Sequence, residues 1–117
     1  MPAHAEKGYL VRHLREATVT PCPCGISNRI FTGADSPTAS VHVTEITDSA
    51  RHYHEVSTEY YYVLEGAGKM ELNDEVVDLE PGLAVLIEPG TRHRVFGDIK
   101  ALILVVPALQ DEDEYLE

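Results

Sequence analysis

The sequence predicts an all-β fold in which short antiparallel strands form a sandwich or a barrel. Segments rich in β-branched and aromatic residues are short, and turn residues separate them every several positions. Helical periodicity is confined, if present at all, to residues 9–17 or to the acidic C-terminal end. This spacing favours antiparallel strands joined by turns over alternating strands and helices.

The expected strands follow one another through most of the chain. Residues 40–47, SVHVTEIT, have the β-branched composition of a half-buried strand, and Asn73-Asp74 is a tight-turn pair that predicts a hairpin. Pro81-Gly82 and Pro89-Gly90 mark two further turns. The expected strands are residues 29–32, 40–47, 59–65, 69–72, 76–79, 83–87, 92–96 and 101–106.

We expect one domain with a segment at each end. Residues 26–107 would form the barrel, and residues 108–117 an acidic tail whose run 111–114 is solvated. Residues 1–25 would form an N-terminal segment that ends in a Cys-Pro-Cys turn. Periodicity does not decide whether residues 9–17 within it form a short helix or a strand.

Composition excludes some classes of partner. The 117 residues suffice for one domain with a real core, and 9 basic residues against 20 acidic ones give a formal charge of −11. An acidic surface repels nucleic acids and anionic membranes, so neither is expected as a partner. Residues 1–8 lack the apolar core of a signal peptide, and no run resembles a membrane span. The cytoplasm is therefore the expected location.

Two cysteines, Cys22 and Cys24, stand in the sequence Pro-Cys-Pro-Cys-Gly. Cysteines this close bridge each other only with strain, so no disulfide framework is expected. A structural zinc site would need a second pair, which the sequence lacks. We expect two thiols in a turn.

The candidate chemistry lies in three histidines and one glutamate. In a strand, His52 and His54 point to the same face, because alternate side chains share a face. Glu59 follows at an odd step, so the polar segment 55–58 must be a turn that resets the register. His93, just after the Pro89-Gly90 turn, could complete the set from a neighbouring strand.

These residue types suit one divalent transition metal. Three neutral imidazoles and a carboxylate fit Fe, Mn, Ni, Co, Cu or Zn better than Ca or Mg. Four protein ligands on a six-coordinate ion would leave two positions open, as metal-assisted chemistry requires.

The pattern resembles the two signatures of the cupin family. His52-x-His54-x4-Glu59-x6-Gly66 is similar to the first, and Gly82-x7-Gly90-x2-His93 is similar to the second. With the strands around them they cover about the middle half of the chain. The resemblance implies a double-stranded β-helix, a jelly-roll-like barrel, with one metal held by His52, His54, Glu59 and His93.

Other candidate residues follow from strand parity. If Glu59 points inward, Tyr61 does too, and its phenol is the tentative catalytic group, with core filler as the alternative. His42 and Glu45 are weaker acid–base candidates, while His4 and His13 are expected to be ordinary surface histidines. Dimerisation is expected through exposed strand edges and the apolar N-terminal segment Tyr9, Leu10 and Val11.

The resemblance leaves the function open among several classes. It implies a small metalloenzyme of dioxygenase, isomerase, decarboxylase or lyase type that acts on a small oxygenated substrate. The alternatives are a non-catalytic module that binds a small molecule or a metal, and a domain that serves mainly for dimerisation. No cluster of lysines and arginines falls on the expected inner face, which argues against a phosphorylated substrate.

Overall fold

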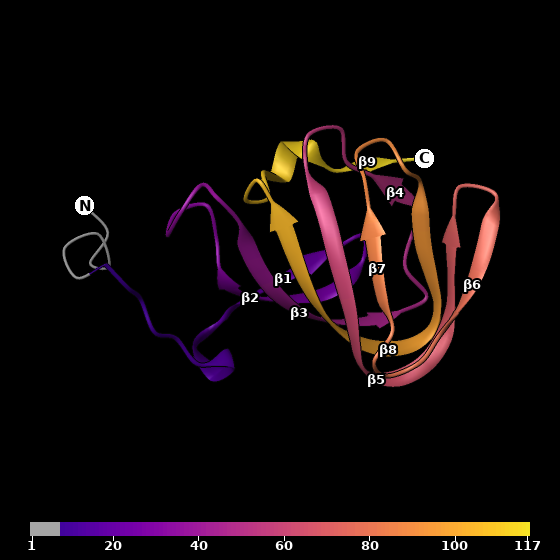
Figure 1. The fold of residues 1–117 in the computed structure, drawn as a ribbon, viewed down its shortest axis with the longest axis horizontal. Helices are drawn as coiled ribbons and strands as arrows, with labels where there is room; N and C mark the ends of the chain where they lie inside the picture. The colour runs from indigo at the N-terminus through magenta and orange to yellow at the C-terminus, as the bar shows by residue number, and fades with distance from the viewer. Residues whose placement is uncertain (1–7) are drawn as a thin grey trace.

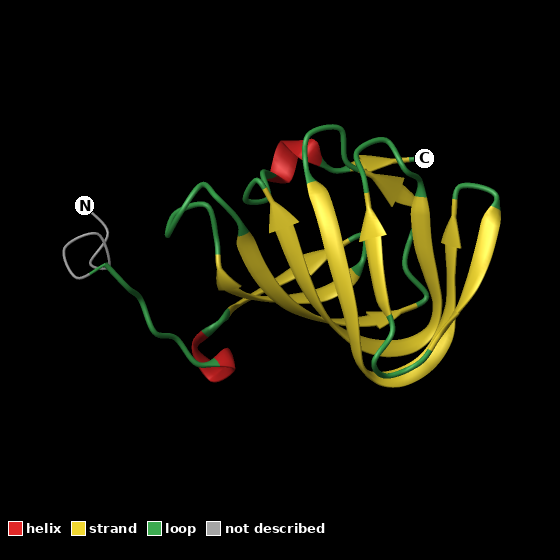
Figure 2. Ribbon diagram, in the orientation of Figure 1, coloured by secondary structure: helices red, strands yellow, loops and turns green. Residues whose placement is uncertain are grey.

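The computed structural model describes residues 8–117, which form a curled sheet of antiparallel strands (Figure 1). The predicted all-β fold is confirmed, and the only helical elements described are two single 3-10 turns (Figure 2). The predictions that His4 is a surface histidine and that residues 1–8 lack a signal-peptide core concern a part of the chain that lies almost entirely outside the described residues. The elements are η1 (Leu14–Glu16), β1 (Thr18–Cys22), β2 (Gly25–Phe31), β3 (Ser40–Thr47), β4 (His52–Tyr53), β5 (Thr58–Leu72), β6 (Glu75–Leu79), β7 (Ala84–Ile87), β8 (His93–Val106), η2 (Asp111–Asp113) and β9 (Tyr115–Leu116).

Two long strands, β5 and β8, pair along their whole length and bend together, which curls the sheet on itself (Figure 1). β8 also pairs with β3 and β4, while β5 also pairs with β6 and β7. The two strands thereby connect all parts of the sheet. No described helix is long and apolar enough to cross a membrane.

The bend depends on glycine, and it corrects the prediction that strands end near Gly66 and Phe96. Both β5 and β8 continue through these positions. Gly66 has a φ of +93°, and a Cβ there would clash with the carbonyl oxygen of Asp98 on the facing strand. Glycine tolerates both conditions, so it bends the paired strands instead of ending them.

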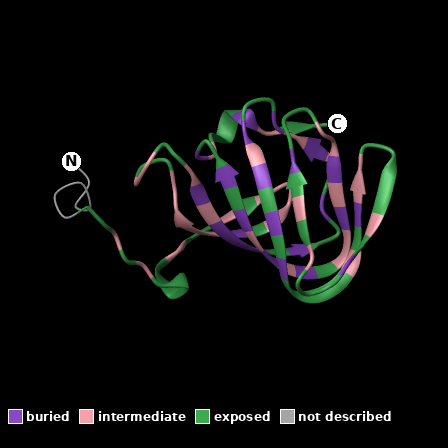
Figure 3. Ribbon diagram, viewed as in Figure 1, coloured by how far each residue is buried: buried purple, intermediate pink, exposed green. Residues whose placement is uncertain are grey.

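The core follows the alternation that the strands predict over the first part of β5, where Glu59, Tyr61 and Val63 are buried and the residues between them are exposed (Figure 3). The alternation is interrupted at the bend. Each large apolar side chain buried in this way contributes roughly 1.5–3 kcal/mol to stability. The predicted hairpin turn is also confirmed, with Asn73 at a φ of +53° between β5 and β6. The buried cluster comprises Ile46, Tyr61, Val63, Met70, Leu79, Ile87, Val95, Ile99, Ala101, Ile103 and Val105.

The N-terminal segment settles one open question and corrects one prediction. Residues 9–17 contain the single turn η1, and the first strand begins only at Thr18. β1 and β2 form a hairpin whose turn brings the Cα atoms of Cys22 and Cys24 to 5.1 Å, and their sulfur atoms are bonded. The expected pair of free thiols is therefore wrong, because the tight hairpin places the two residues within disulfide range.

The acidic C-terminal end is also more ordered than expected. Asp111 and Glu112 are exposed, as a solvated tail would be, but Asp113 is only 3% exposed. Tyr115 and Leu116 then form β9, which pairs with β4 (Figure 1). The C-terminal segment is thus tied to the strand that carries His52.

Candidate metal centre

The structure brings His52, His54, Glu59 and His93 together inside the curled sheet. One ligand atom of each lies within 4.8 Å of those of the others, and all four residues are buried. β4 places His52 opposite His93, the first residue of β8. Glu59 enters from the second position of β5.

The turn between His54 and Glu59 resets the register as predicted. β4 ends at Tyr53 and β5 begins at Thr58, so the odd step between the two ligands is taken up outside regular strand. The carbonyl of His54 accepts a hydrogen bond from the backbone of Gly90 at 2.7 Å. This bond ties the turn to the Pro89-Gly90 turn, from which the chain leads to His93.

Each histidine is oriented by a hydrogen bond from its Nδ1 to a backbone carbonyl. Such a partner fixes the tautomer with hydrogen on Nδ1 and leaves the lone pair of Nε2 free to bind a metal. The three Nδ1–oxygen distances are 2.8 Å from His52 to Ala50, 2.7 Å from His54 to Asp113 and 2.9 Å from His93 to Thr91.

The ligand atoms fit a cation better than they fit one another. Glu59 Oε1 lies 3.2 Å from His54 Nε2 and 3.1 Å from His93 Nε2, yet none of these three buried atoms makes a well-formed hydrogen bond. Ligand atoms bound at about 2.1 Å to one ion lie roughly 3.0–4.2 Å apart, which agrees with this spacing. The residues therefore fit a divalent transition metal.

Burial and charge act against each other on the protonation of these groups. Burial lowers the pKa of His52 to about 4. Burial also lowers that of His54, but the adjacent Glu59 carboxylate outweighs it and raises the pKa to about 9. Burial raises the pKa of Glu59, but hydrogen bonds and charge from His54 and His93 outweigh burial and lower the pKa below its ordinary value. The carboxyl group is therefore ionised. In the metal-free protein the Glu59 carboxylate therefore faces a protonated His54, whose proton a metal ion must displace.

Tyr61 points inward, as strand parity predicts. Its side chain is 2% exposed, whereas Tyr60 and Tyr62 on either side are about half exposed. The ring lies edge-on to His93, with centroids 6.3 Å apart. Burial and then the Glu59 charge hold the pKa of the phenol well above 10, so its hydroxyl stays protonated.

On the inner face, a row of paired residues runs from Tyr61 across Ile103 to two polar residues on β3 and β2. The strand register aligns Tyr61 with Ile103, Ile103 with His42, and His42 with Arg29. Paired residues project from the same face of a sheet. The His42 side chain is 4% exposed with an Nε2 that has no hydrogen-bond partner, and Arg29 is 12% exposed. Glu45, the other candidate, is exposed.

Sequence reasoning missed Arg29 and Asp113. Arg29 lies on a short segment whose composition predicts a strand but does not show which of its side chains point inward. Its alternation with the buried Ser27 is the one signal that places it inside. Asp113 stands in an acidic run that resembles any solvated tail, so the sequence carries no signal for its burial.

Comparison with known proteins identifies the family. The family model described as Cupin domain matches residues 40–107, more than half of the chain. The chain belongs to the cupin family. This cupin is 31% identical over 93 residues to an uncharacterized protein of Methanocaldococcus jannaschii, covering 75% of this chain and 74% of that protein.

Solved structures agree with this assignment. A protein from Planctomyces limnophilus matches with a TM-score of 0.86 and 34% identity, covering 92% of this cupin and 96% of that chain. A nucleoside dehydratase from Streptomyces matches with a TM-score of 0.79 and 22% identity, covering 93% and 91%. The latter likeness shows the fold alone.

Proposed function

We propose that this cupin is a small metalloenzyme that holds one divalent transition metal with His52, His54, Glu59 and His93. The carrying observation is the convergence of three oriented imidazoles and an ionised carboxylate on one point. The candidate ions are Fe, Mn, Ni, Co, Cu and Zn. When bound, such an ion supplies a Lewis acid with open coordination positions.

The protein residues around the site suit a small oxygenated substrate. Tyr61, the proposed catalytic residue, keeps its proton and can donate a hydrogen bond to a substrate oxygen beside His93. Burial lowers the pKa of His42 to about 4, with Arg29 adding to the effect, so its imidazole is neutral. The neutral ring offers a hydrogen bond to a further substrate oxygen, whereas the Arg29 guanidinium is engaged by Asp111 at 3.0 Å.

The reaction class is proposed from the site and supported by the fold. The nucleoside dehydratase with the same fold is an enzyme on a small oxygen-rich molecule. We assign this cupin to the same broad group of dioxygenase, isomerase, decarboxylase or lyase reactions on small molecules.

A non-catalytic metal-binding module is the second candidate, and one observation favours it. All four ligand residues are at most 5% exposed, which suits a site that retains its ion without exchanging substrates. Under this alternative, small molecules would neither bind the loaded protein nor change its metal spectrum.

The experiment that separates the two loads the metal-free protein with Co²⁺ and follows its visible absorption. One equivalent should produce the full spectrum under either candidate. Addition of small hydroxy acids and diols should shift the spectrum of an open, enzyme-like centre. A spectrum that no such compound changes would favour the closed module and contradict the enzyme.

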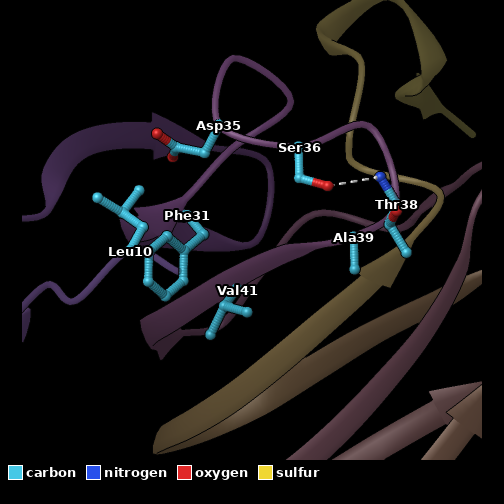
Figure 4. Close-up of a pocket in the computed structure, with 7 residues that line it drawn as sticks. All are labelled: Leu10, Phe31, Asp35, Ser36, Thr38, Ala39 and Val41. Atoms are coloured by element: carbon cyan, nitrogen blue, oxygen red, sulfur yellow. Dashed lines mark hydrogen bonds between the residues drawn. The ribbon is translucent and has the colours of Figure 1, made fainter. Parts of the chain in front are cut away.

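We also propose that two copies of the chain associate through the outer face of the sheet. The register aligns Phe31, Val41, Leu104, Tyr60 and Leu86 in one uncharged row across β2, β3, β8, β5 and β7. An apolar pocket of about 220 Å³ adjoins the Phe31 end, where Leu10 lies close to Phe31 and Val41 (Figure 4). An exposed apolar surface of this kind marks an interaction site.

A further inference from the structure

Asp113 is the buried member of an acidic run whose first two residues are exposed. Its side chain is 3% exposed, whereas its neighbours Asp111 and Glu112 are exposed. A buried carboxylate is costly unless several donors satisfy it. Its hydrogen bonds therefore indicate why the fold keeps it there.

Those hydrogen bonds all come from the turn between two metal-site residues. Asp113 Oδ1 accepts from the backbone of Glu55 at 2.9 Å and of Val56 at 3.1 Å. Oδ2 accepts from the backbone of Ser57 at 3.0 Å. Three successive N–H groups thus point at one carboxylate, a charge-assisted arrangement that fixes the path of this turn.

The backbone of Asp113 also orients a proposed metal ligand directly. Its carbonyl oxygen accepts the hydrogen bond from His54 Nδ1 at 2.7 Å. The corresponding carbonyls for His52 and His93 lie two residues before each histidine, so those rings are oriented locally. Only His54, among the three, depends on a segment 59 residues away.

Two further contacts of the C-terminal segment, and one of Pro107 just before it, lie in the same region. β9 pairs with β4, so that Tyr115 stacks on Tyr53 with ring centroids 5.2 Å apart. The hydroxyl of Ser57 donates to the carbonyl of Pro107 at 3.1 Å. The segment therefore contacts both the strand before His54 and the turn after it.

We propose that Asp113 is a positioning residue of the metal centre, and that the C-terminal segment 108–117 is the part of the fold that fixes His54. This inference rests on the proposed metal site. The side chain of Asp113 sets the turn that separates His54 from Glu59, and its carbonyl sets the tautomer of His54. Neither contact could be predicted from the two cupin signatures, because Asp113 lies outside both.

The test compares full-length Asp113→Ala and Asp113→Asn with Glu112→Ala, an exposed neighbour, as the matched control. We expect Asp113→Ala to weaken Co²⁺ binding about 10- to 100-fold, as loss of a group behind a metal ligand does. Asp113→Asn, which keeps one acceptor oxygen, should lose less, and Glu112→Ala should bind like the wild type. Unchanged affinity in Asp113→Ala would overturn the proposal.

A second readout does not need the metal. In the metal-free protein, the amides of Glu55, Val56 and Ser57 should exchange hydrogen faster in Asp113→Ala. The Nδ1–H of His54, which donates to the carbonyl of residue 113, should exchange faster as well. If the wild type binds no Co²⁺, the proposed function fails while these measurements still decide the role of Asp113. If Asp113→Ala does not fold, Asp113→Asn decides it, because the amide preserves the side-chain volume. Wild-type exchange rates at these three amides and at His54 Nδ1–H in the folded variants would overturn the proposal.

Discussion

At the scale of single residues, three backbone carbonyls decide how the candidate centre can work. Each carbonyl accepts a hydrogen bond from the Nδ1–H of one histidine, and this bond orients Nε2 toward the centre of the site. The rings are therefore oriented for a metal ion before it binds. In the metal-free protein His54 still carries a proton on Nε2, which the metal must displace.

Metal affinity should depend on pH through His54. Its pKa is raised to about 9 in the metal-free protein, so below that pH the ring carries a proton that a metal must displace. Affinity should consequently rise about tenfold per pH unit between pH 6 and 8, and fall on acidification. Competition with a chelator of known affinity at pH 6, 7 and 8 measures this slope. An affinity independent of pH over this range would contradict the ligation by His54.

Tyr61 should matter for the substrate and not for the metal. Tyr61→Phe removes only the hydroxyl, and the ring beside His93 remains to fill the core. We expect unchanged Co²⁺ stoichiometry and a loss of about 0.5–1.5 kcal/mol in binding of small oxygenated ligands, the value of one hydrogen bond. Titration of both loaded proteins with the same ligand compares them. Equal ligand affinity would assign Tyr61 to the core alone.

At the scale of elements, the sequence predicts local structure well and continuity poorly. The alternation through Glu59, Tyr61 and Val63 correctly predicts which side chains are buried, because strand parity is a local property. Gly66 suggests a strand end, although the strand bends and continues there. A single sequence does not distinguish these two uses of glycine, because the difference depends on the facing strand.

Gly66→Ala should test the glycine bend. The variant must adopt a φ of +93° and also place a Cβ against the backbone of Asp98, so both strain and a clash oppose it. Gly82 has the same φ but no neighbouring atom within 4 Å, which makes Gly82→Ala the matched control. We expect a loss of about 1–2 kcal/mol for the control and at least about 1 kcal/mol more for Gly66→Ala.

Urea denaturation of the two variants measures this difference directly. Equal losses of unfolding free energy would show that the close approach of β5 and β8 costs nothing beyond the backbone strain.

At the scale of the whole molecule, the sequence predicts the ligand set but not its support. The spacings of His52, His54, Glu59 and His93 indicate one site because two known signatures carry them. Asp113 reaches that site from an acidic run 59 residues after His54. No periodicity or spacing in a single sequence encodes such a contact. The division into residues 1–25, 26–107 and 108–117 remains a prediction.

The protein should be a homodimer in solution. The uncharged row on the outer face is the surface that two copies, each with a formal charge of −11, can bring together with little repulsion. Light scattering should give about twice the chain mass of 12.9 kDa. Leu104→Glu, in the middle of the row, should give a monomer, and Val76→Glu on the separate hairpin strand β6 should not. A wild-type mass near 12.9 kDa at micromolar concentration would contradict the dimer.

The central claim is that four residues form one metal site, and metal content per chain tests it most directly. The comparison includes the wild type, His93→Ala, and His13→Ala as the exposed histidine control, with circular dichroism to verify folding. We expect one equivalent of Co²⁺ in the wild type and in His13→Ala, and an affinity at least about tenfold weaker in a folded His93→Ala. Full stoichiometry and wild-type affinity in His93→Ala would contradict the four-residue site.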